Sequence, residues 1–310
     1  MNLFKISKNK ILDIKDFIKQ GEFQVIEDNI DHFFDKKFLK GNFWIKGDIL
    51  SGTELQIDGN LQVEGVVEKV KIKCNGDVII KNGFLGQNEG YVECNGNFYA
   101  TYIQNSSVKA NEIIIGDSVS NSNIIALHGL IVHGKGKIIS GNFYAKDYII
   151  AKEIGSSSLT KTNLKIGYDF LRKRKIEKIK EKLVELKLNI DENEELFRNI
   201  FKKIDYPEYE IDIIIKNITN FDESNIKLLK LLENIQLKEE FEFLKEELER
   251  INTRDIANLD AFLKTNIIHP GVNISILDKS IFINKKLEKD DIIMIRENVN
   301  AWKLLLEDLR

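Results

Sequence analysis

Apolar and polar residues alternate in short runs through the middle of the chain, from about residue 41 to residue 167. Runs such as Leu61-Gln62-Val63, Val70-Lys71-Ile72 and Val108-Lys109-Ala110 present an apolar side chain at every second position. An alternation with period 2 is typical of a strand with one buried face. The pattern therefore predicts that this segment is made of short β-strands.

The strands are separated by a recurring turn unit, which is Gly or a related turn residue, then Asn or Asp, then an apolar residue. Its clearest copies are Gly96-Asn97-Phe98-Tyr99-Ala100 and Gly141-Asn142-Phe143-Tyr144-Ala145, which are identical over five residues. Ordering the apolar residue of each copy gives steps of 17, 20, 15, 17 and 13 between Leu61, Val78, Phe98, Ile113, Leu130 and Phe143. A sandwich or barrel does not need one unit in one phase, whereas a solenoid does, because equivalent residues stack in successive coils. We therefore predict a parallel β-helix of about seven or eight coils over 41–167.

Glycine is concentrated in the same segment, since 17 of the 19 glycines lie between Gly41 and Gly167. Glycine and asparagine tolerate the positive φ that tight bends require, so we expect them at the corners of the coils.

After Gly167 the period changes from two to between three and four. Residues 168–204 contain no Gly or Pro and are rich in Lys, Glu, Leu and Ile, which predicts a long helix with an apolar seam interrupted only by Asn193. A break at Asp205-Tyr206-Pro207 leads to residues 209–220, whose conformation the pattern does not predict, and Ser224 then starts a second long helix. We predict that residues 168–265 form a long antiparallel coiled-coil hairpin. Its seam contains Ile176, Ile179, Leu183, Leu186, Ile190, Phe197 and Ile200 in the first helix and, after Ile235 and a slip of phase, Phe241, Leu244, Leu248 and Ile251 in the second.

The period returns to two near Thr265 and continues through Val272-Asn273-Ile274 and Ile292-Ile293-Met294. We expect residues 266–310 to return as strands that cap or extend the β-helix, followed by a short helix. Residues 1–40 are expected to be an N-terminal leader that caps the other end.

Composition and charge limit the classes of function. A net charge of -3 and a pI of about 6.0 argue against a protein dominated by binding to nucleic acid. No apolar run is long enough for an integral membrane segment, and the first residues lack the core of a signal peptide, so we expect a cytoplasmic protein. Two cysteines are too few for a disulfide framework.

Several motifs together resemble the flagellar assembly protein A family of bacteria. The matching segments are Gly41 to Ile49, Ile138-Ile139-Ser140-Gly141, Ile154-Gly155-Ser156, Thr160-Lys161-Thr162, Lys165-Ile166-Gly167 and His269-Pro270-Gly271-Val272. The resemblance implies a mainly β fold, a single-stranded right-handed parallel β-helix with an inserted coiled coil. It also implies a non-catalytic protein linked to flagellar assembly, motility or polar organisation.

The residues that could carry chemistry are expected to have structural roles. Cys74 and Cys94 occupy matching units, so we expect them to stack as buried thiols in consecutive coils. His128 and His133 flank one strand and are expected to point to opposite faces, which disfavours a joint metal site. The basic run Arg172-Lys173-Arg174-Lys175 is interpreted as a solvated helix face. We predict no catalytic residue, no metal ligand and no cofactor.

The leading hypothesis is a scaffold that binds one or more proteins of the flagellar or polar machinery through the helical arm, with Ile213, Ile214 and Ile215 as a possible contact at its tip. One alternative is a β-helix enzyme acting on a carbohydrate or acyl donor, which would require clustered carboxylates. The other is a self-assembling, filament-forming β-helix, which would require open ends. The sequence predicts neither the partner nor the oligomeric state.

Overall fold

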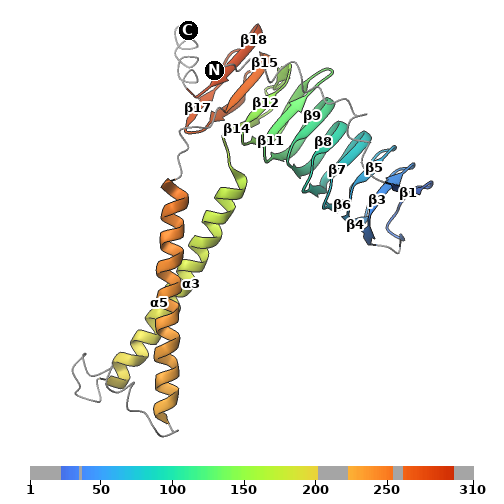
Figure 1. Ribbon diagram of the computed structural model, residues 1–310. Coiled ribbons are helices and arrows are strands. Elements are labelled where there is room, and N and C mark those ends of the chain that lie inside the picture. The colour runs from blue at the N-terminus through green and yellow to red at the C-terminus, as the bar shows by residue number, and fades with distance from the viewer. Residues whose placement is uncertain (1–21, 35–36, 202–222, 254–260, 297–310) are drawn as a thin grey trace. The chain divides into compact units, whose positions relative to one another are not determined.

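The structure, a computed structural model, describes residues 22–34, 37–201, 223–253 and 261–296, without the side chains of 196–201, 223–231 and 252–253. The chain divides into two compact units. The first contains the strands on both sides of the insertion, and the second, Phe170–Asn258, contains the helices (Figure 1). The positions of the two units relative to each other are not determined, so each is described separately.

The first unit is a parallel β-solenoid. Its strands, in chain order, are β1 (Phe23–Ile26), β2 (Phe38–Lys40), β3 (Asn42–Ile45), β4 (Glu54–Asp58), β5 (Leu61–Val63), β6 (Lys71–Cys74), β7 (Val78–Cys94), β8 (Phe98–Ala110), β9 (Ile113–Ala126), β10 (Gly129–Val132), β11 (Lys137–Ala145), β12 (Tyr148–Ile150), β13 (Glu153–Ile154), β14 (Thr162–Ile166), β15 (Phe262–Ile268), β16 (Val272–Ile276), β17 (Lys279–Phe282) and β18 (Leu287–Ile295). The mainly β fold and the β-solenoid are as predicted; the right hand of the solenoid stays a prediction.

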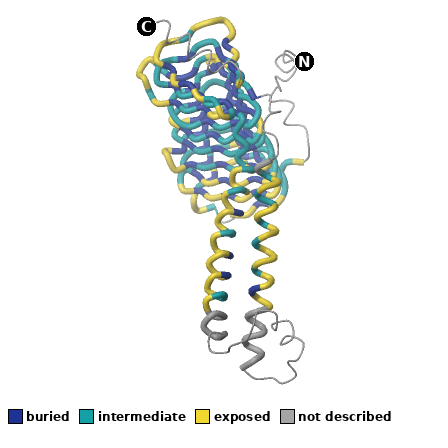
Figure 2. The backbone as a smooth tube through the Cα atoms, turned by 90° about the vertical axis from the view of Figure 1, so that its left-hand side faces the viewer, coloured by how far each residue is buried: buried dark blue, intermediate teal, exposed yellow. Residues whose placement is uncertain are grey.

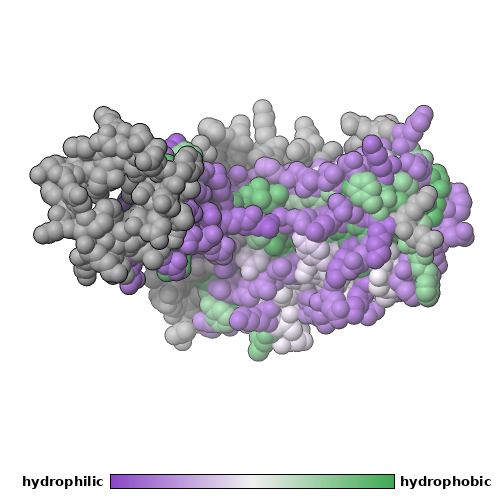
Figure 3. All heavy atoms as spheres, turned by 90° about the horizontal axis from the view of Figure 1, so that it is seen from below, coloured by the Kyte–Doolittle hydropathy of each residue, from purple (hydrophilic) through white to green (hydrophobic). Residues whose placement is uncertain are grey.

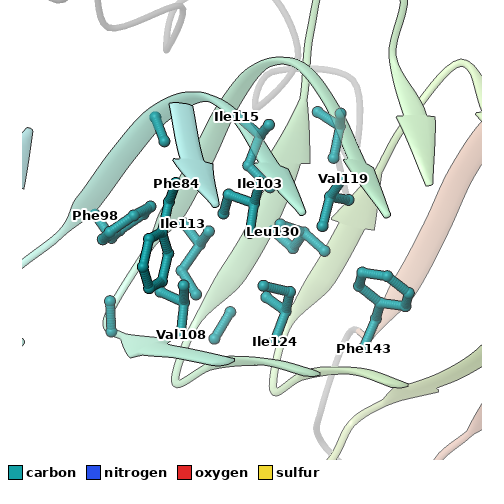
Figure 4. Close-up of a cluster of buried hydrophobic side chains, with 14 of the residues drawn as sticks. Phe84, Phe98, Ile103, Val108, Ile113, Ile115, Val119, Ile124, Leu130 and Phe143 are labelled. Atoms are coloured by element: carbon teal, nitrogen blue, oxygen red, sulfur yellow. The ribbon is translucent and has the colours of Figure 1, made fainter. Parts of the chain in front are cut away.

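Successive coils pair in parallel, and their interior residues form ladders. One ladder contains Phe43, Leu61, Val78, Phe98, Ile113, Leu130, Ile149 and Leu263. A second contains Leu55, Ile72, Val92, Val108, Ile124, Phe143, Leu164 and Ile274. A third contains Ile30, Ile49, Val67, Phe84, Ile103, Val119, Ile138, Ile154 and Ile268. The three ladders converge on one continuous apolar core (Figures 2 and 4).

The two identical pentapeptides lie on different faces of the solenoid. Phe98 is in register with Val78 and Ile113, whereas Phe143 is in register with Ile124 and Leu164. The residue that follows Leu130 in its ladder is Ile149, so the last step is 19 residues rather than the predicted 13. Both phenylalanines are fully buried, but Figure 4 shows them on opposite sides of the cluster, so they do not stack on each other.

Hydrogen bonds between coils explain the Gly-Asn/Asp turn unit. The side-chain oxygen of Asn60 accepts a hydrogen bond from the backbone N–H of Asp77 at 2.8 Å, and that of Asp77 accepts one from Asn97 at 2.7 Å. A Cβ added at Gly76 would overlap Asn60 Oδ1, and one added at Gly96 would overlap Asp77 Oδ1. Glycine is therefore required here because the corner side chain of the preceding coil occupies the space of its Cβ. Positive φ, the predicted reason, applies instead at positions such as Gly52 and Gly141.

The solenoid begins before Gly41, inside the segment expected to be a leader. β1 pairs with β3, Ile30 with Ile49, and β2 with β4, all in parallel. Residues 23–34 and 37–40 thus belong to the first coil.

At the other end, the chain continues the solenoid after the insertion. β15 pairs in parallel with β12 and β13, and β16 pairs in parallel with β14, so these strands extend the solenoid by one coil. β17 then pairs with β16, and β18 with β15, in the antiparallel sense. Parallel stacking therefore stops at this coil. The predicted C-terminal helix lies outside the described residues.

The second unit contains two long helices, α3 (Phe170–Phe201) and α5 (Glu223–Thr253). The beginning of α3 contacts the end of α5. Arg172 donates to the carbonyl oxygen of Ile251 at 2.7 Å, and Lys175 Nζ lies 2.6 Å from Glu247 Oε1. Further along, Lys238 pairs with Glu194 at 2.8 Å. Figure 2 shows that both helices are mostly exposed, unlike the solenoid interior.

Candidate functional site

The carboxylates of the solenoid corners take part in contacts between coils. Asp48 Oδ1 accepts a hydrogen bond from the backbone N–H of Val66 at 2.6 Å, and Asp117 accepts from the N–H and the ammonium group of Lys135. Burial raises the pKa of Asp117, but the hydrogen bonds from Lys135 lower it by more. The pKa therefore lies below its usual range. Asp58 accepts from Asn75, and Asp147 pairs with His128. Together with Asp77, these acids support the fold rather than forming the carboxylate cluster that the enzyme alternative requires.

Cys74 and Cys94 lie in register in consecutive coils, both buried and both free thiols. Burial raises the pKa of Cys74 to about 11 and raises that of Cys94 as well. A thiol must lose its proton to act as a nucleophile or metal ligand, so burial disfavours both roles for these groups.

The histidines do not converge. His128 pairs with Asp147 at one corner, whereas His133 is half-buried, and burial together with Lys152 holds its pKa below the usual range. His269 Nε2 lies 2.8 Å from Glu153 Oε1. In the part of the chain that the structure describes, no group of three or more His, Cys, Asp or Glu side chains is placed to hold a metal ion.

A polar cluster on the outer surface was not predicted from the sequence. Glu64 Oε1 accepts hydrogen bonds from Trp44 Nε1 at 2.6 Å, Gln62 Nε2 at 3.0 Å and Lys81 Nζ at 2.6 Å. These residues come from three successive coils, so only the register of the solenoid brings them together.

On the face seen in Figure 3, apolar side chains form small patches among hydrophilic ones. Among the coloured atoms of this view, the apolar side chains do not merge into one large patch.

The predicted seam positions of α3 are more buried than those of α5. Ile179, Leu186 and Ile190 are buried, and Ile176 and Leu183 are half-buried. The side chains of Phe197 and Ile200 lie outside the described part of the chain. The described seam positions of α3 are thus buried or half-buried.

The seam of the second helix departs from the prediction at one turn. Phe241, Leu244, Leu248 and Ile251 are half-buried, but Ile235, predicted to belong to the seam, is exposed. Asn234 is buried in its place, with 4% of its surface exposed and no hydrogen-bond partner for Oδ1. Counting back from Leu237 in steps of three and four reaches Asn234, so the predicted slip of phase is unnecessary. The apolar character of Ile235 hid this regular spacing.

Both helices also carry exposed apolar side chains outside the seam. Val184 and Leu188 are exposed on α3, and Leu232, Ile235 and Phe243 are exposed on α5. Val184 and Leu188 are one turn apart and so lie on one side of α3. Sequence analysis missed these residues because it considered only one apolar stripe per helix.

The basic run at the start of α3 takes part in contacts within the helical unit. Arg172 and Lys175 contact α5, and Lys173 lies 4.0 Å from Glu177 on its own helix. Between Arg172 and Lys182 there are seven basic and two acidic residues, and between Glu239 and Arg250 six acidic and two basic. The two ends that meet therefore have opposite charge.

The predicted contact at Ile213, Ile214 and Ile215 lies outside the described residues. Among the described helices, none has the length and apolar character needed to cross a membrane.

Comparison with known proteins gives one match. The model of the flagellar assembly protein A β-solenoid domain matches residues 29–299. No curated protein and no solved structure matches the chain significantly. The matched range covers most of the sequence and includes the described solenoid from Asn29 onward together with both helices. The chain therefore belongs to the flagellar assembly protein A β-solenoid family.

Proposed function

We propose that the protein is a non-catalytic structural component of flagellar assembly, in which the solenoid is a scaffold and the helix pair binds a partner protein. The family is tied by its description to flagellar assembly and to a solenoid domain. The use of corner carboxylates and buried thiols to hold coils together agrees with a structural role. The proposal places the protein in the cytoplasm, as composition predicts, and its partners in the flagellar or polar machinery.

The proposed binding element is an antiparallel coiled-coil hairpin formed by α3 and α5. Supporting it, the covered positions of both helices follow a spacing of three and four residues. The contacts of Arg172 and Lys175 also join the start of one helix to the end of the other. The opposite charges of those two ends favour this direction of pairing over the parallel one.

The observation that carries the proposal is the apolar surface that remains exposed on the helices. Val184, Leu188 and Phe243 each expose more than half of their surface. Exposure to water is unfavourable for such side chains, and a helix from a partner protein would cover Val184 and Leu188 by packing along their side of α3. The predicted contact at 213–215 would extend this surface.

The test compares capture of partners by the wild-type chain and by variants in the native bacterium. The double substitution Val184→Glu and Leu188→Glu should abolish capture and reduce the number of flagella, because it charges the exposed stripe while leaving the seam unchanged. Deletion of residues 206–222 tests the tip separately. Full capture by the stripe variant would contradict the role of the stripe, and full capture by the deletion variant would contradict that of the tip.

A matched control keeps the test specific. Lys178→Gln and Asn189→Glu change the net charge by the same amount at exposed positions of α3 that are not three, four or seven residues from Val184 or Leu188. Both double variants should retain the helical signal in circular dichroism. If the control variant loses capture to the same degree, general charge rather than the apolar stripe determines binding.

A further inference from the structure

The first coil of the solenoid has strand edges that pair on one side only. β1 pairs with β3 and β2 with β4, and no other described strand lies along their outer edges. An unpaired strand edge presents backbone N–H and C=O groups that can accept another strand. The opposite end is protected differently, since β18 carries the consecutive charged residues Glu288, Lys289, Asp290 and Asp291.

Exposed apolar side chains gather at this first coil. Val25, Phe33 and Phe38 expose 46%, 75% and 57% of their surface. By contrast, no large apolar side chain is exposed between residues 41 and 158, all of which the structure describes. Exposed large apolar side chains reappear toward the other end of the solenoid, at Leu159, Phe282 and Ile293, so among the described residues they are confined to its two ends.

The interior of the first coil is already closed. Ile30 and Leu39 are buried, and Phe34 packs against the core from the loop that follows Ile30. The coil therefore does not need a plug for its core. Among the described residues, none covers the strand edge or the exposed Val25 and Phe38, and another β-edge would match this surface.

The charges of the first coil are divided between its two strands. Glu27 and Asp28 follow β1 and are exposed, and Glu27 Oε2 lies 3.9 Å from Lys46 Nζ of the next coil. Lys37 and Lys40 lie at β2 and are exposed. A partner that complements this coil must therefore present a basic edge to β1 and an acidic edge to β2. A second copy of the same coil, turned by a two-fold axis, presents those two edges in that order.

We propose that two copies of the chain associate end to end through their first coils, with β1 of each copy beside β2 of the other. A two-fold axis across the solenoid end reverses the direction of the strands, so β1 and β2 would meet antiparallel. Val25 of one copy would lie beside Phe38 of the other on the outer surface. Because the contact is isologous and β18 protects the far end with charge, the assembly stops at two copies and does not form a filament.

Charge exchange between copies tests the proposal. In one variant, Glu27→Lys and Asp28→Lys make the first coil basic at both strands; in the other, Lys37→Glu and Lys40→Glu make it acidic at both. Sedimentation equilibrium should show a dimer for the wild-type chain and a dissociation constant raised about tenfold or more for each variant alone. An equal mixture of the two variants should restore dimers, because both of its contacts then join opposite charges.

The controls test whether the first coil, and no other surface, joins the two copies. Glu89→Lys, in a middle coil, changes an exposed acid without touching the first coil and should leave the dimer unchanged. A wild-type chain that stays monomeric would overturn the proposal, as would a dimer unaffected by both charge variants. A monomeric full-length chain that dimerises only after removal of residues 1–21 would also overturn it, since the N-terminal residues would then be the occupant of this edge.

Discussion

The solenoid and the helix pair bury very different amounts of apolar surface. In the solenoid, the ladder positions from Leu61 to Leu263 are almost completely buried, and each one packs between equivalents in the coils before and after it. In the helix pair, only Ile179, Leu186 and Ile190 reach that degree of burial among the described side chains, all on α3. On α5, the buried residue among those described is the polar Asn234.

The solenoid is therefore stabilised by contacts within itself. The helix pair leaves apolar side chains exposed that could contact another protein. Each buried aliphatic or aromatic side chain contributes about 1.5–3 kcal/mol, and the solenoid contains several dozen of them. The helices instead rely on a narrow seam and on exposed ion pairs, which contribute little. A scaffold needs the first property, and a surface that binds a partner needs the second.

The largest effect is expected from truncating a side chain in the middle of the solenoid core. Phe84→Ala should lower the free energy of unfolding of the solenoid by about 3–5 kcal/mol, because Phe84 is fully buried within one ladder. Chemical denaturation followed by Trp44 fluorescence, in a Trp302→Phe background, measures this transition.

The matched change in the other unit is Leu186→Ala. It should weaken the helical transition in far-ultraviolet circular dichroism by about 2–3 kcal/mol while the Trp44 transition stays in place. If Leu186→Ala shifted the Trp44 transition equally, the two units would unfold as one and the comparison would fail.

Two glycines with positive φ should differ according to the space around them. A Cβ at Gly141 would overlap the backbone oxygen of Ser122, whereas at Gly52 the nearest atom would be 3.5 Å away. Gly141→Ala should therefore cost about 3 kcal/mol or more, and Gly52→Ala about 1 kcal/mol, the cost of backbone strain alone. Thermal unfolding of both variants tests this. Equal losses would show that conformation, and not the close approach of coils, is the reason for glycine at both positions.

Asn234→Leu should stabilise the helix pair by about 1–2 kcal/mol. The substitution removes a buried amide oxygen that lacks a hydrogen bond and places an apolar side chain at the seam. The measurement is the midpoint of the helical transition, with the exposed Gln236→Leu as control. A loss of stability in Asn234→Leu would mean that the amide is satisfied in solution and that the seam is complete without it.

The smallest effect concerns the contact between strands before and after the insertion. Burial raises the pKa of Glu153, but hydrogen bonds from Lys137 and His269 lower it more, so the pKa in the folded state lies below its usual range. The carboxylate therefore stabilises the fold above its unfolded pKa, and this contribution is lost as the pH falls through the folded pKa. Glu153→Gln should cost about 1 kcal/mol or less at neutral pH.

The control for this change is to measure the stability of both proteins at low pH. Melting temperatures of wild type and Glu153→Gln should converge in acid, where the wild-type carboxyl is protonated. A difference between the two proteins that persists unchanged at low pH would exclude the ion pair as its cause.

The repeat could be predicted from the sequence because successive coils carry the same turn residues. The position at which the solenoid starts could not be predicted. Gly76 and Gly96 are visible in the sequence because each accommodates a corner side chain of the coil before it. No described coil precedes the first one, and residues 22–40 contain no glycine. The prediction therefore began the solenoid at Gly41 and assigned β1 and β2 to a leader.

Further errors arose where two positions share a local pattern but differ in their neighbours. The pentapeptide at Gly141 matches that at Gly96, yet its strand follows a different face, which only the register with Ile124 shows. Similarly, Ile235 is the more apolar residue, but the regular spacing of α5 buries Asn234. The Glu64 cluster had no local signal, since its donors are distributed over three coils.

The corner contact also means that the sequence of one coil constrains the sequence of the next coil, but not of the coil before it. Asn60 and Asp77 each require a glycine in the next coil, Gly76 and Gly96, although Asn97 is followed at the same corner by Asn111. A glycine requires nothing of the coil before it. A coil added at the C-terminal end must therefore leave space for the corner side chain of the coil before it. Removal of the C-terminal coil creates no steric overlap in the coils that remain. Loss of the first coil would leave Gly47 with no Asn29 side chain to accommodate, so that it kept only the conformational freedom that glycine adds to an unfolded chain.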